Sequence, residues 1–153
     1  MIRTVVIFFF AVVLVSSEIV EIDNGKINGL LIKSTAGKSV LSFSRIPYAV
    51  PPINELRFQA PLPAKNWEGV FDGTKGPVSC FQTTQERDDI PMTEDCLHIN
   101  IFTKNLTDVK PVVVWIHSGA FETGSGAVDS ERLRLVTTSI IGDVFIFQKS
   151  QNY

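Results

Sequence analysis

Hydrophobic positions along this chain fall into short runs separated by polar, glycine-containing or proline-rich segments. Residues 27–33 and 40–44 are apolar or β-branched and are split by the turn-forming segment 34–38. This arrangement predicts an early antiparallel hairpin or meander. Residues 46–52 and 61–63 are rich in proline, which lacks the backbone donor that a strand ladder needs. We therefore expect ordered coil in those two segments.

The second half of the chain has a more α/β-like pattern. Residues 96–103 alternate between apolar and more polar positions, which predicts a strand with one core face. Residues 112–116 are five consecutive apolar residues after a proline, which is typical of a strand covered on both faces. A short amphipathic helix over 130–141 and a further core strand over 143–148 complete the expected elements.

The first residues have the pattern of a targeting segment. Arg3 supplies a positive charge, Val5–Val15 is an uninterrupted apolar run, and small residues precede Glu18. The alternative is a transmembrane anchor, but eleven apolar residues fall short of the roughly 20 that a spanning helix needs. We therefore expect a secretory signal peptide over 1–17, a mature domain over 18–153, and no stable membrane anchor.

Composition and charge narrow the class of protein. The chain has 153 residues, of which 44% are hydrophobic and 20% charged, so one globular domain is expected. The net charge is −2 and no run of Lys or Arg is present. A nucleic-acid partner is therefore not expected.

Secretion affects the interpretation of the two cysteines. Cys80 and Cys96 are the only pair, and an oxidising compartment allows them to form a disulfide. The alternative is two free buried thiols. Asn105-Leu106-Thr107 is a single N-glycosylation sequon that follows a predicted strand, as a surface loop would.

A set of ordered motifs runs from about residue 19 to residue 126. The motifs are Phe43-Ser-Arg-Ile-Pro-Tyr-Ala49, Pro51-Pro52, Leu56-Arg57-Phe58, Pro61-Leu-Pro63, Trp67, Cys80, Glu94-Asp95-Cys96-Leu97, Asn100 and Trp115-Ile-His-Ser-Gly-Ala-Phe121. In order and spacing they resemble the type-B carboxylesterase and cholinesterase family. The resemblance implies an α/β fold: the N-terminal part of an α/β-hydrolase fold, in which a small antiparallel N-terminal sheet leads into the central sheet.

For the loop after residue 116, the resemblance implies an oxyanion hole. Gly119 and Ala120 would supply two backbone N–H donors, and a third donor would come from beyond this chain. Ser118 stands where the family usually has glycine, so a positive φ there would be strained. The alternative is a tight strand-to-loop connection without chemistry.

The resemblance also implies an ion pair. The family pairs the arginine of Leu-Arg-Phe with the glutamate before Asp-Cys-Leu, which are Arg57 and Glu94 in this chain. We expect a buried pair that fixes the loop between Cys80 and Cys96. The alternative is two independent solvated charges.

Neither histidine fits a catalytic base. In an α/β-hydrolase the order along the chain is Ser, then Asp or Glu, then His, and no Gly-x-Ser-x-Gly elbow occurs in this sequence. His117 is interpreted as a loop-positioning residue and His98 as a strand-face residue. The two histidines have no further ligands at metal-binding spacing, so neither a metal site nor a cofactor is expected.

Three functional hypotheses follow. The first is a secreted serine carboxylesterase acting on a small-molecule carboxylic ester, of which this chain is a truncated and inactive portion without the catalytic Ser and late His. The second is a non-catalytic, cholinesterase-like adhesion or binding protein. The third is a secreted fragment without function. The sequence alone does not specify the acyl or alcohol group of an ester substrate.

Overall fold

The computed structural model describes residues 17–33, 37–83, 89–127 and 143–147, and strands dominate this part of the chain. The elements are β1 (Ser17–Ile22), β2 (Gly25–Lys33), β3 (Ser39–Pro47), the 3₁₀ helix η1 (Asn54–Leu56), β4 (Val70–Asp72), β5 (Ser79–Cys80), β6 (Met92–Thr93), β7 (His98–Thr103), β8 (Val112–Ile116) and β9 (Asp143–Phe147). The hairpin expected from the pattern is present as β2 and β3. The strands β1, β4, β5 and β6 were not predicted.

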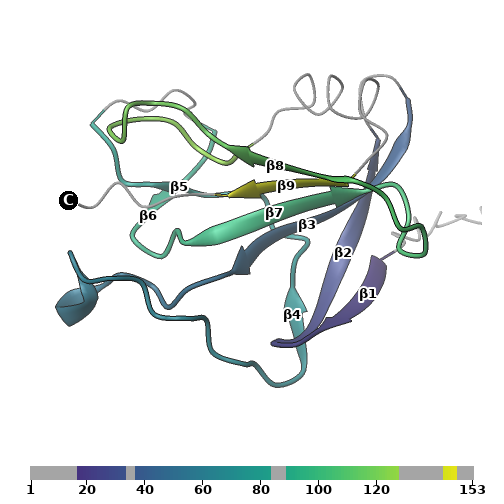
Figure 1. Cartoon of the computed structure of the whole chain (residues 1–153), viewed down its shortest axis with the longest axis horizontal. Helices are drawn as coiled ribbons and strands as arrows, with labels where there is room; N and C mark the ends of the chain where they lie inside the picture. The colour runs from purple at the N-terminus through teal and green to yellow at the C-terminus, as the bar shows by residue number, and fades with distance from the viewer. Residues whose placement is uncertain (1–16, 34–36, 84–88, 128–142, 148–153) are drawn as a thin grey trace, which may run out of the picture.

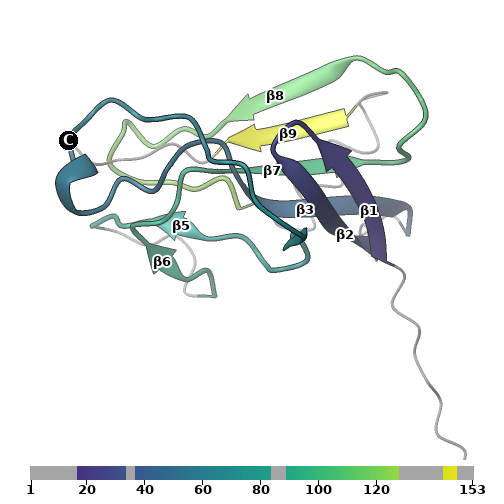
Figure 2. The same ribbon diagram turned by 90° about the horizontal axis from the view of Figure 1, so that it is seen from below.

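Seven of these strands form one mixed sheet (Figure 1). Its order is β1-β2-β3-β7-β9-β8, and β4 pairs with β2 in parallel. The first four strands of that order are antiparallel to their neighbours, whereas β8 and β9 are parallel. The small antiparallel N-terminal sheet is thus continuous with the central strands, as expected for the N-terminal part of an α/β-hydrolase fold. Figure 2 shows the β5–β6 pair lying outside this sheet.

The core lies where the antiparallel strands meet. Its buried residues share one property, a branched or aromatic side chain that suits a pleated surface. They are Ile27, Leu41, Phe43, Ile46 and Ile99. Trp67 and Phe71 pack against this cluster, with their ring centroids 5.2 Å apart. Burial raises the pKa of the Tyr48 hydroxyl, which lies at the edge of the same cluster.

Strand β3 runs further than the proline pattern predicted. It continues to Pro47, which pairs with His98 of β7, so the expectation of coil from residue 46 was wrong. Pro47 is the last residue of the strand, where its missing N–H costs little. Between Phe43 and Ile46 the register with β7 shifts, and Arg45 adopts φ +58°. This β-bulge turns Arg45 out of the ladder.

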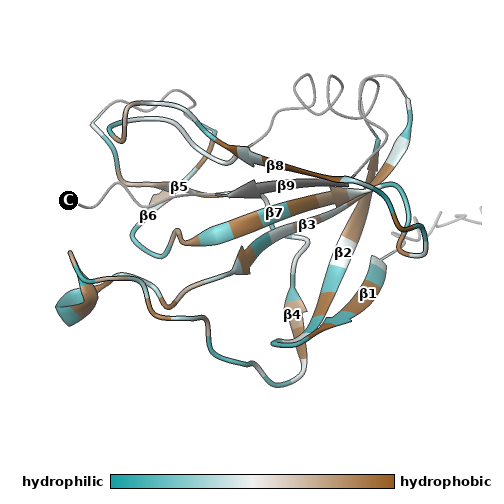
Figure 3. Ribbon diagram, viewed as in Figure 1, coloured by the Kyte–Doolittle hydropathy of each residue, from teal (hydrophilic) through white to brown (hydrophobic). Residues whose placement is uncertain are grey.

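Strand β7 is buried on both faces, not on one as predicted. Figure 3 shows hydrophobic and hydrophilic positions alternating along it. Ile99 belongs to the core, while His98, Asn100 and Phe102 on the other face are also buried. On that face the buried Asn100 amide donates to the Gly126 carbonyl and accepts the Arg45 N–H, as a buried polar group requires.

Strand β8 was correctly placed, but its predicted burial on both faces is wrong. It pairs with β9 on one side and lies at the end of the sheet order. Val112, Val114, Trp115 and Ile116 are 52%, 54%, 52% and 62% exposed. In the described part of the chain no second neighbour covers it. Figure 3 shows a largely hydrophobic strand at the border of the sheet.

Strand β9 confirms residues 143–147 of the predicted strand over 143–148. It lies between β7 and β8 and pairs with both. The predicted helix over 130–141 falls outside the described residues, as does nearly all of the expected signal peptide. Ser17, the last residue of that predicted peptide, is the first residue of β1. Among the described residues, no helix has the length and apolar character that crossing a membrane requires.

Candidate functional site

The loop after β8 is a left-handed turn. Gly119, Ala120 and Phe121 have φ of +123°, +52° and +66°. The carbonyl oxygen of Gly119 accepts hydrogen bonds from the N–H groups of Glu122 and Thr123, at 2.8 and 3.0 Å. Ala120 and Phe121 carry a Cβ, so a positive φ costs each of them about 1–2 kcal/mol of backbone strain. Such strain is often found at functional sites.

The strain is not at Ser118. A positive φ at this serine would have been strained, but Ser118 is not among the positive-φ residues. The turn begins one residue later, at Gly119. A Cβ at Gly119 would lie 1.8 Å from the Thr123 carbonyl oxygen, so only glycine fits there.

The turn leaves backbone donors unused. Within the described residues, the N–H groups of Gly119 and Ala120 donate to no protein acceptor. Ala120 is exposed and Gly119 is partly exposed, so solvent or a ligand can reach this part of the loop. Neighbouring free N–H groups on a fixed turn are a suitable binding arrangement for an oxyanion.

The ring of His117 packs against the loop that follows it. The residue is buried, and its ring Nδ1 lies 2.8 Å from the carbonyl oxygen of Ser118. Gly124, at φ +98°, passes so close that a Cβ there would lie 2.4 Å from that oxygen and 2.8 Å from Nδ1. The ring is therefore enclosed between the end of β8 and the returning chain. The buried Nε2 has no partner within the described residues.

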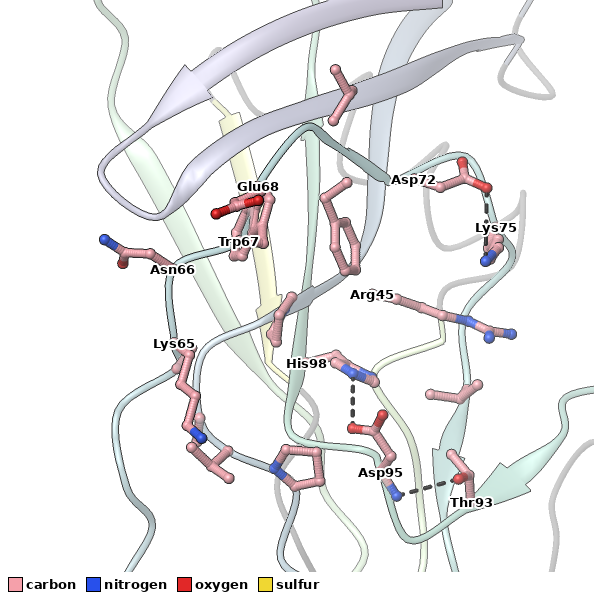
Figure 4. A pocket seen from close by; sticks show the side chains of 18 of the residues that line it. Arg45, Lys65, Asn66, Trp67, Glu68, Asp72, Lys75, Thr93, Asp95 and His98 are labelled. Atoms are coloured by element: carbon pink, nitrogen blue, oxygen red, sulfur yellow. Dashed lines mark hydrogen bonds and ion pairs between the residues drawn. The ribbon is translucent and has the colours of Figure 1, made fainter.

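A separate cleft of about 930 Å³ lies beside β3 and β7. Figure 4 shows His98 and Asp95 side by side within it, with Arg45 approaching from one side and Lys65 from the other. Trp67 supplies part of its apolar wall. No residue of the loop 117–121 lines this cleft. The loop 117–121 and the cleft are therefore different sites.

His98 and Asp95 form the cleft's polar pair. His98 Nε2 lies 3.3 Å from Asp95 Oδ1. Burial lowers the pKa of His98, and the Arg45 charge adds to that effect, while Asp95 opposes it. Among the described residues that line the cleft, the side-chain hydroxyl is that of Thr93. Its oxygen accepts a hydrogen bond from the backbone N–H of Asp95. A histidine–carboxylate pair without an adjacent nucleophile does not form a triad.

Cys80 and Cys96 are joined by a disulfide, with their Cα atoms 5.1 Å apart. Both residues are buried, and the described residues include no free cysteine, so the alternative of two thiols is wrong for this structure. The parallel β5–β6 pair flanks the bond, with Cys80 opposite Thr93.

Arg57 and Glu94 are in contact through their guanidinium and carboxylate groups. Their side chains are 52% and 32% exposed, so the expectation of a buried pair was wrong. Solvent screening limits such a pair to about 1 kcal/mol or less. The pair joins the η1 segment to the disulfide loop.

The sequon residue Asn105 lies in a tight turn after β7. Its side-chain oxygen accepts the N–H groups of Thr107 and Asp108, and its amide donates to the Asp108 carboxylate at 2.8 Å. Hydrogen bonds from Lys110 and Asn105 lower the pKa of Asp108. The amide nitrogen that a glycan would occupy is thus engaged in the turn.

Two polar side chains that reach the loop region were given no role by the sequence. Gln82 and Asn100 contact the chain that follows the turn, at Gly124 and Gly126. In the sequence, Asn100 stood out only as one of the residues that resemble the family motifs. Gln82 could have been noticed only from its position two residues after Cys80. Within the described residues, no group of three His, Cys, Asp or Glu side chains is placed to hold a metal ion.

Known proteins resemble this chain in sequence. The family model of the carboxylesterase family matches residues 16–143. Acetylcholinesterase-1 of Trittame loki is 34% identical over 143 residues, covering 86% of this chain and 25% of the relative. Cocaine esterase of Oryctolagus cuniculus is 36% identical over 129 residues, covering 74% and 24%.

A bacterial relative has a similar identity and coverage. Para-nitrobenzyl esterase of Bacillus subtilis (strain 168) is 38% identical over 120 residues, covering 72% of this chain and 23% of the relative. The chain therefore spans about a quarter of the length of these relatives. Since the family model matches most of its residues, the chain belongs to the carboxylesterase family.

Proposed function

We propose that this chain is the N-terminal portion of a secreted serine carboxylesterase that hydrolyses a small-molecule carboxylic ester. Family membership supports the reaction class. The observation that carries the proposal is the left-handed turn in which, among the residues that the structure describes, the N–H groups of Gly119 and Ala120 have no protein acceptor.

The proposed role of the turn is electrostatic. A serine hydroxyl would attack the ester carbonyl carbon, its proton would pass to a histidine, and the carbonyl oxygen would become an oxyanion. The two N–H groups would donate hydrogen bonds to that oxyanion, and loss of one such donor typically costs about 10²–10³-fold in kcat. Collapse of this intermediate releases the alcohol, and water then hydrolyses the acyl-enzyme.

The serine and the late histidine would have to come from sequence that this chain does not contain, since it has no nucleophile elbow. We therefore propose that the 153-residue chain alone is inactive. The proposal includes secretion after removal of the leader, and glycosylation at Asn105 once its turn opens to a transferase.

The inactivity is tested with the purified 153-residue chain and a p-nitrophenyl ester. We expect release of p-nitrophenol at the rate of a heat-treated control. A burst of product stoichiometric with the protein would reveal an acyl-enzyme and contradict the proposal.

A further inference from the structure

The segment that follows the oxyanion turn is held by side chains from distant parts of the chain. The turn itself is closed by the Gly119 carbonyl, which explains its shape but not its position on the sheet. The chain then returns over the end of β8, where Gly124 lies against Ser118 and the ring of His117. Whatever holds Gly124 in place therefore also limits where Ser118 and Gly119 can lie.

Gln82 makes that contact. Its side-chain oxygen accepts the Gly124 N–H at 2.7 Å, across 42 residues of sequence. Its amide nitrogen donates to the hydroxyl of Ser79 at 2.6 Å, and that hydroxyl donates to the Cys80 carbonyl. Ser79 is 1% exposed, so the anchor of the Gln82 amide is a fixed part of the interior. Both ends of the amide are thus engaged.

Asn100 holds the same segment two residues further on. This buried side chain donates to the Gly126 carbonyl at 3.1 Å and accepts the N–H of Arg45 in the β3 bulge at 3.0 Å. The returning segment 124–126 is therefore bound at one end to the disulfide region and at the other to the central sheet.

We propose that Gln82 is a positioning residue of the oxyanion hole: it ties Gly124, and through it the donors Gly119 and Ala120, to the region fixed by the Cys80–Cys96 disulfide. The inference rests on the proposed function and extends it. A donor that moves by about 1 Å can lose about 10²-fold in rate, so a contact remote from the substrate can control the reaction. Gln82 itself touches no reacting atom.

The first test measures amide hydrogen exchange in the 153-residue chain. Gln82→Met, which removes both hydrogen bonds at nearly constant volume, should speed exchange of the Gly124 amide by roughly tenfold. The amide of Ile99, in the core of β7, should not change. Gln82→Glu keeps an acceptor for Gly124 and should restore slow exchange. Gln59→Met, at an exposed glutamine, is the matched control.

Two outcomes of the exchange measurement would contradict the positioning role of Gln82. An unchanged Gly124 amide in Gln82→Met, or equal acceleration of Ile99, would overturn the proposal, because the first shows no contact and the second only a global loss of structure. Should Gln82→Met not fold, Ser79→Ala removes only the oxygen that anchors the Gln82 amide. It should speed Gly124 exchange to a smaller extent, and no change there would also overturn the proposal.

The second test measures catalysis in a chimera in which the part of this chain that aligns with the Bacillus subtilis para-nitrobenzyl esterase replaces the aligned segment of that enzyme. Gln82→Met should lower kcat by roughly tenfold with little change in KM, and Gln82→Glu should restore it. Full kcat in a chimera whose Gly124 amide exchanges rapidly would overturn the positioning role. A chimera without any activity would contradict the proposed function instead, and the exchange result would stand independently of it.

Discussion

At the scale of single residues, the loop after β8 depends on backbone conformations that most side chains avoid. Gly119 tolerates its φ of +123° and the nearby Thr123 carbonyl oxygen, which a Cβ at this position would meet at 1.8 Å, whereas Ala120 and Phe121 adopt positive φ at a cost. The turn persists because Gly119 and Gly124 are packed against their neighbours. The residue that limits the loop is therefore a glycine, while the strain lies in the two residues after it.

Gly119→Ala should disrupt the turn, whereas Ala120→Gly should stabilise it. Gly119→Ala places a methyl group onto the Thr123 carbonyl, so the turn must open and the Glu122 and Thr123 amides should lose their protection. Ala120→Gly relieves the positive φ and should raise the free energy of unfolding by about 0.5–1 kcal/mol. Amide exchange and denaturant unfolding measure the two effects. Slow exchange of both amides in Gly119→Ala would contradict the geometry.

His98 should make stability depend on pH. Its folded-state pKa is lowered by burial, so between that value and the unfolded value of about 6.5 the unfolded state binds more protons. Stability from this group is complete above pH 6.5 and is lost as the pH falls through the folded-state pKa, with a slope of at most about 1.4 kcal/mol per pH unit.

The matched variant is His98→Gln, which keeps an amide donor for Asp95 but cannot titrate. Urea unfolding at a series of pH values below 7 should show a shallower loss of stability in the variant than in the parent chain. Equal slopes in the two proteins would show that His98 does not carry the effect.

At the scale of elements, β8 is the strand whose environment departs most from its sequence. Five apolar residues in a row suit a strand inside a sheet, yet among the described strands β8 lies at the end of the sheet, with exposed side chains on both faces. An apolar strand with unpaired backbone groups and no charged side chain can pair with another chain. Association through β8 is therefore expected for this chain.

A charge on this strand should suppress that association. Val114→Lys changes a side chain that is 54% exposed, so the free energy of unfolding should change by less than about 1 kcal/mol. Sedimentation velocity at rising concentration should show less self-association than in the parent. Val109→Lys, at a fully exposed valine outside the strand, is the control and should associate like the parent. Equal association of both variants would exclude β8 as the contact.

At the scale of the whole molecule, local patterns predicted more than long-range arrangements. The β2–β3 hairpin and the positions of β7, β8 and β9 follow from signals that neighbouring residues carry, and the disulfide follows from the presence of a single cysteine pair in a chain expected to be secreted. The burial of β8 depends on which strands flank it, and the bulge at Arg45 depends on the register with β7. Neither can be obtained from periodicity.

In the candidate site, too, the features that local motifs indicate were predicted and the long-range contacts were not. The turn at Gly119 was located through a motif, whereas Gln82 lies 42 residues from the atom that it contacts. No pattern in one sequence links two such positions. The exposed state of the Arg57–Glu94 pair likewise depends on what covers it, not on the two residues themselves.

The proposed oxyanion hole at Gly119 and Ala120 is best tested by measuring kcat of the Bacillus subtilis chimera on a p-nitrobenzyl ester. We predict that the folded chimera hydrolyses the ester and that Gly119→Ala lowers kcat by about 10²–10³-fold. Gly76→Ala, at a glycine with open space around it, should leave kcat unchanged. A folded chimera without turnover, or one in which Gly119→Ala retains full kcat, would contradict the role of this turn as an oxyanion hole.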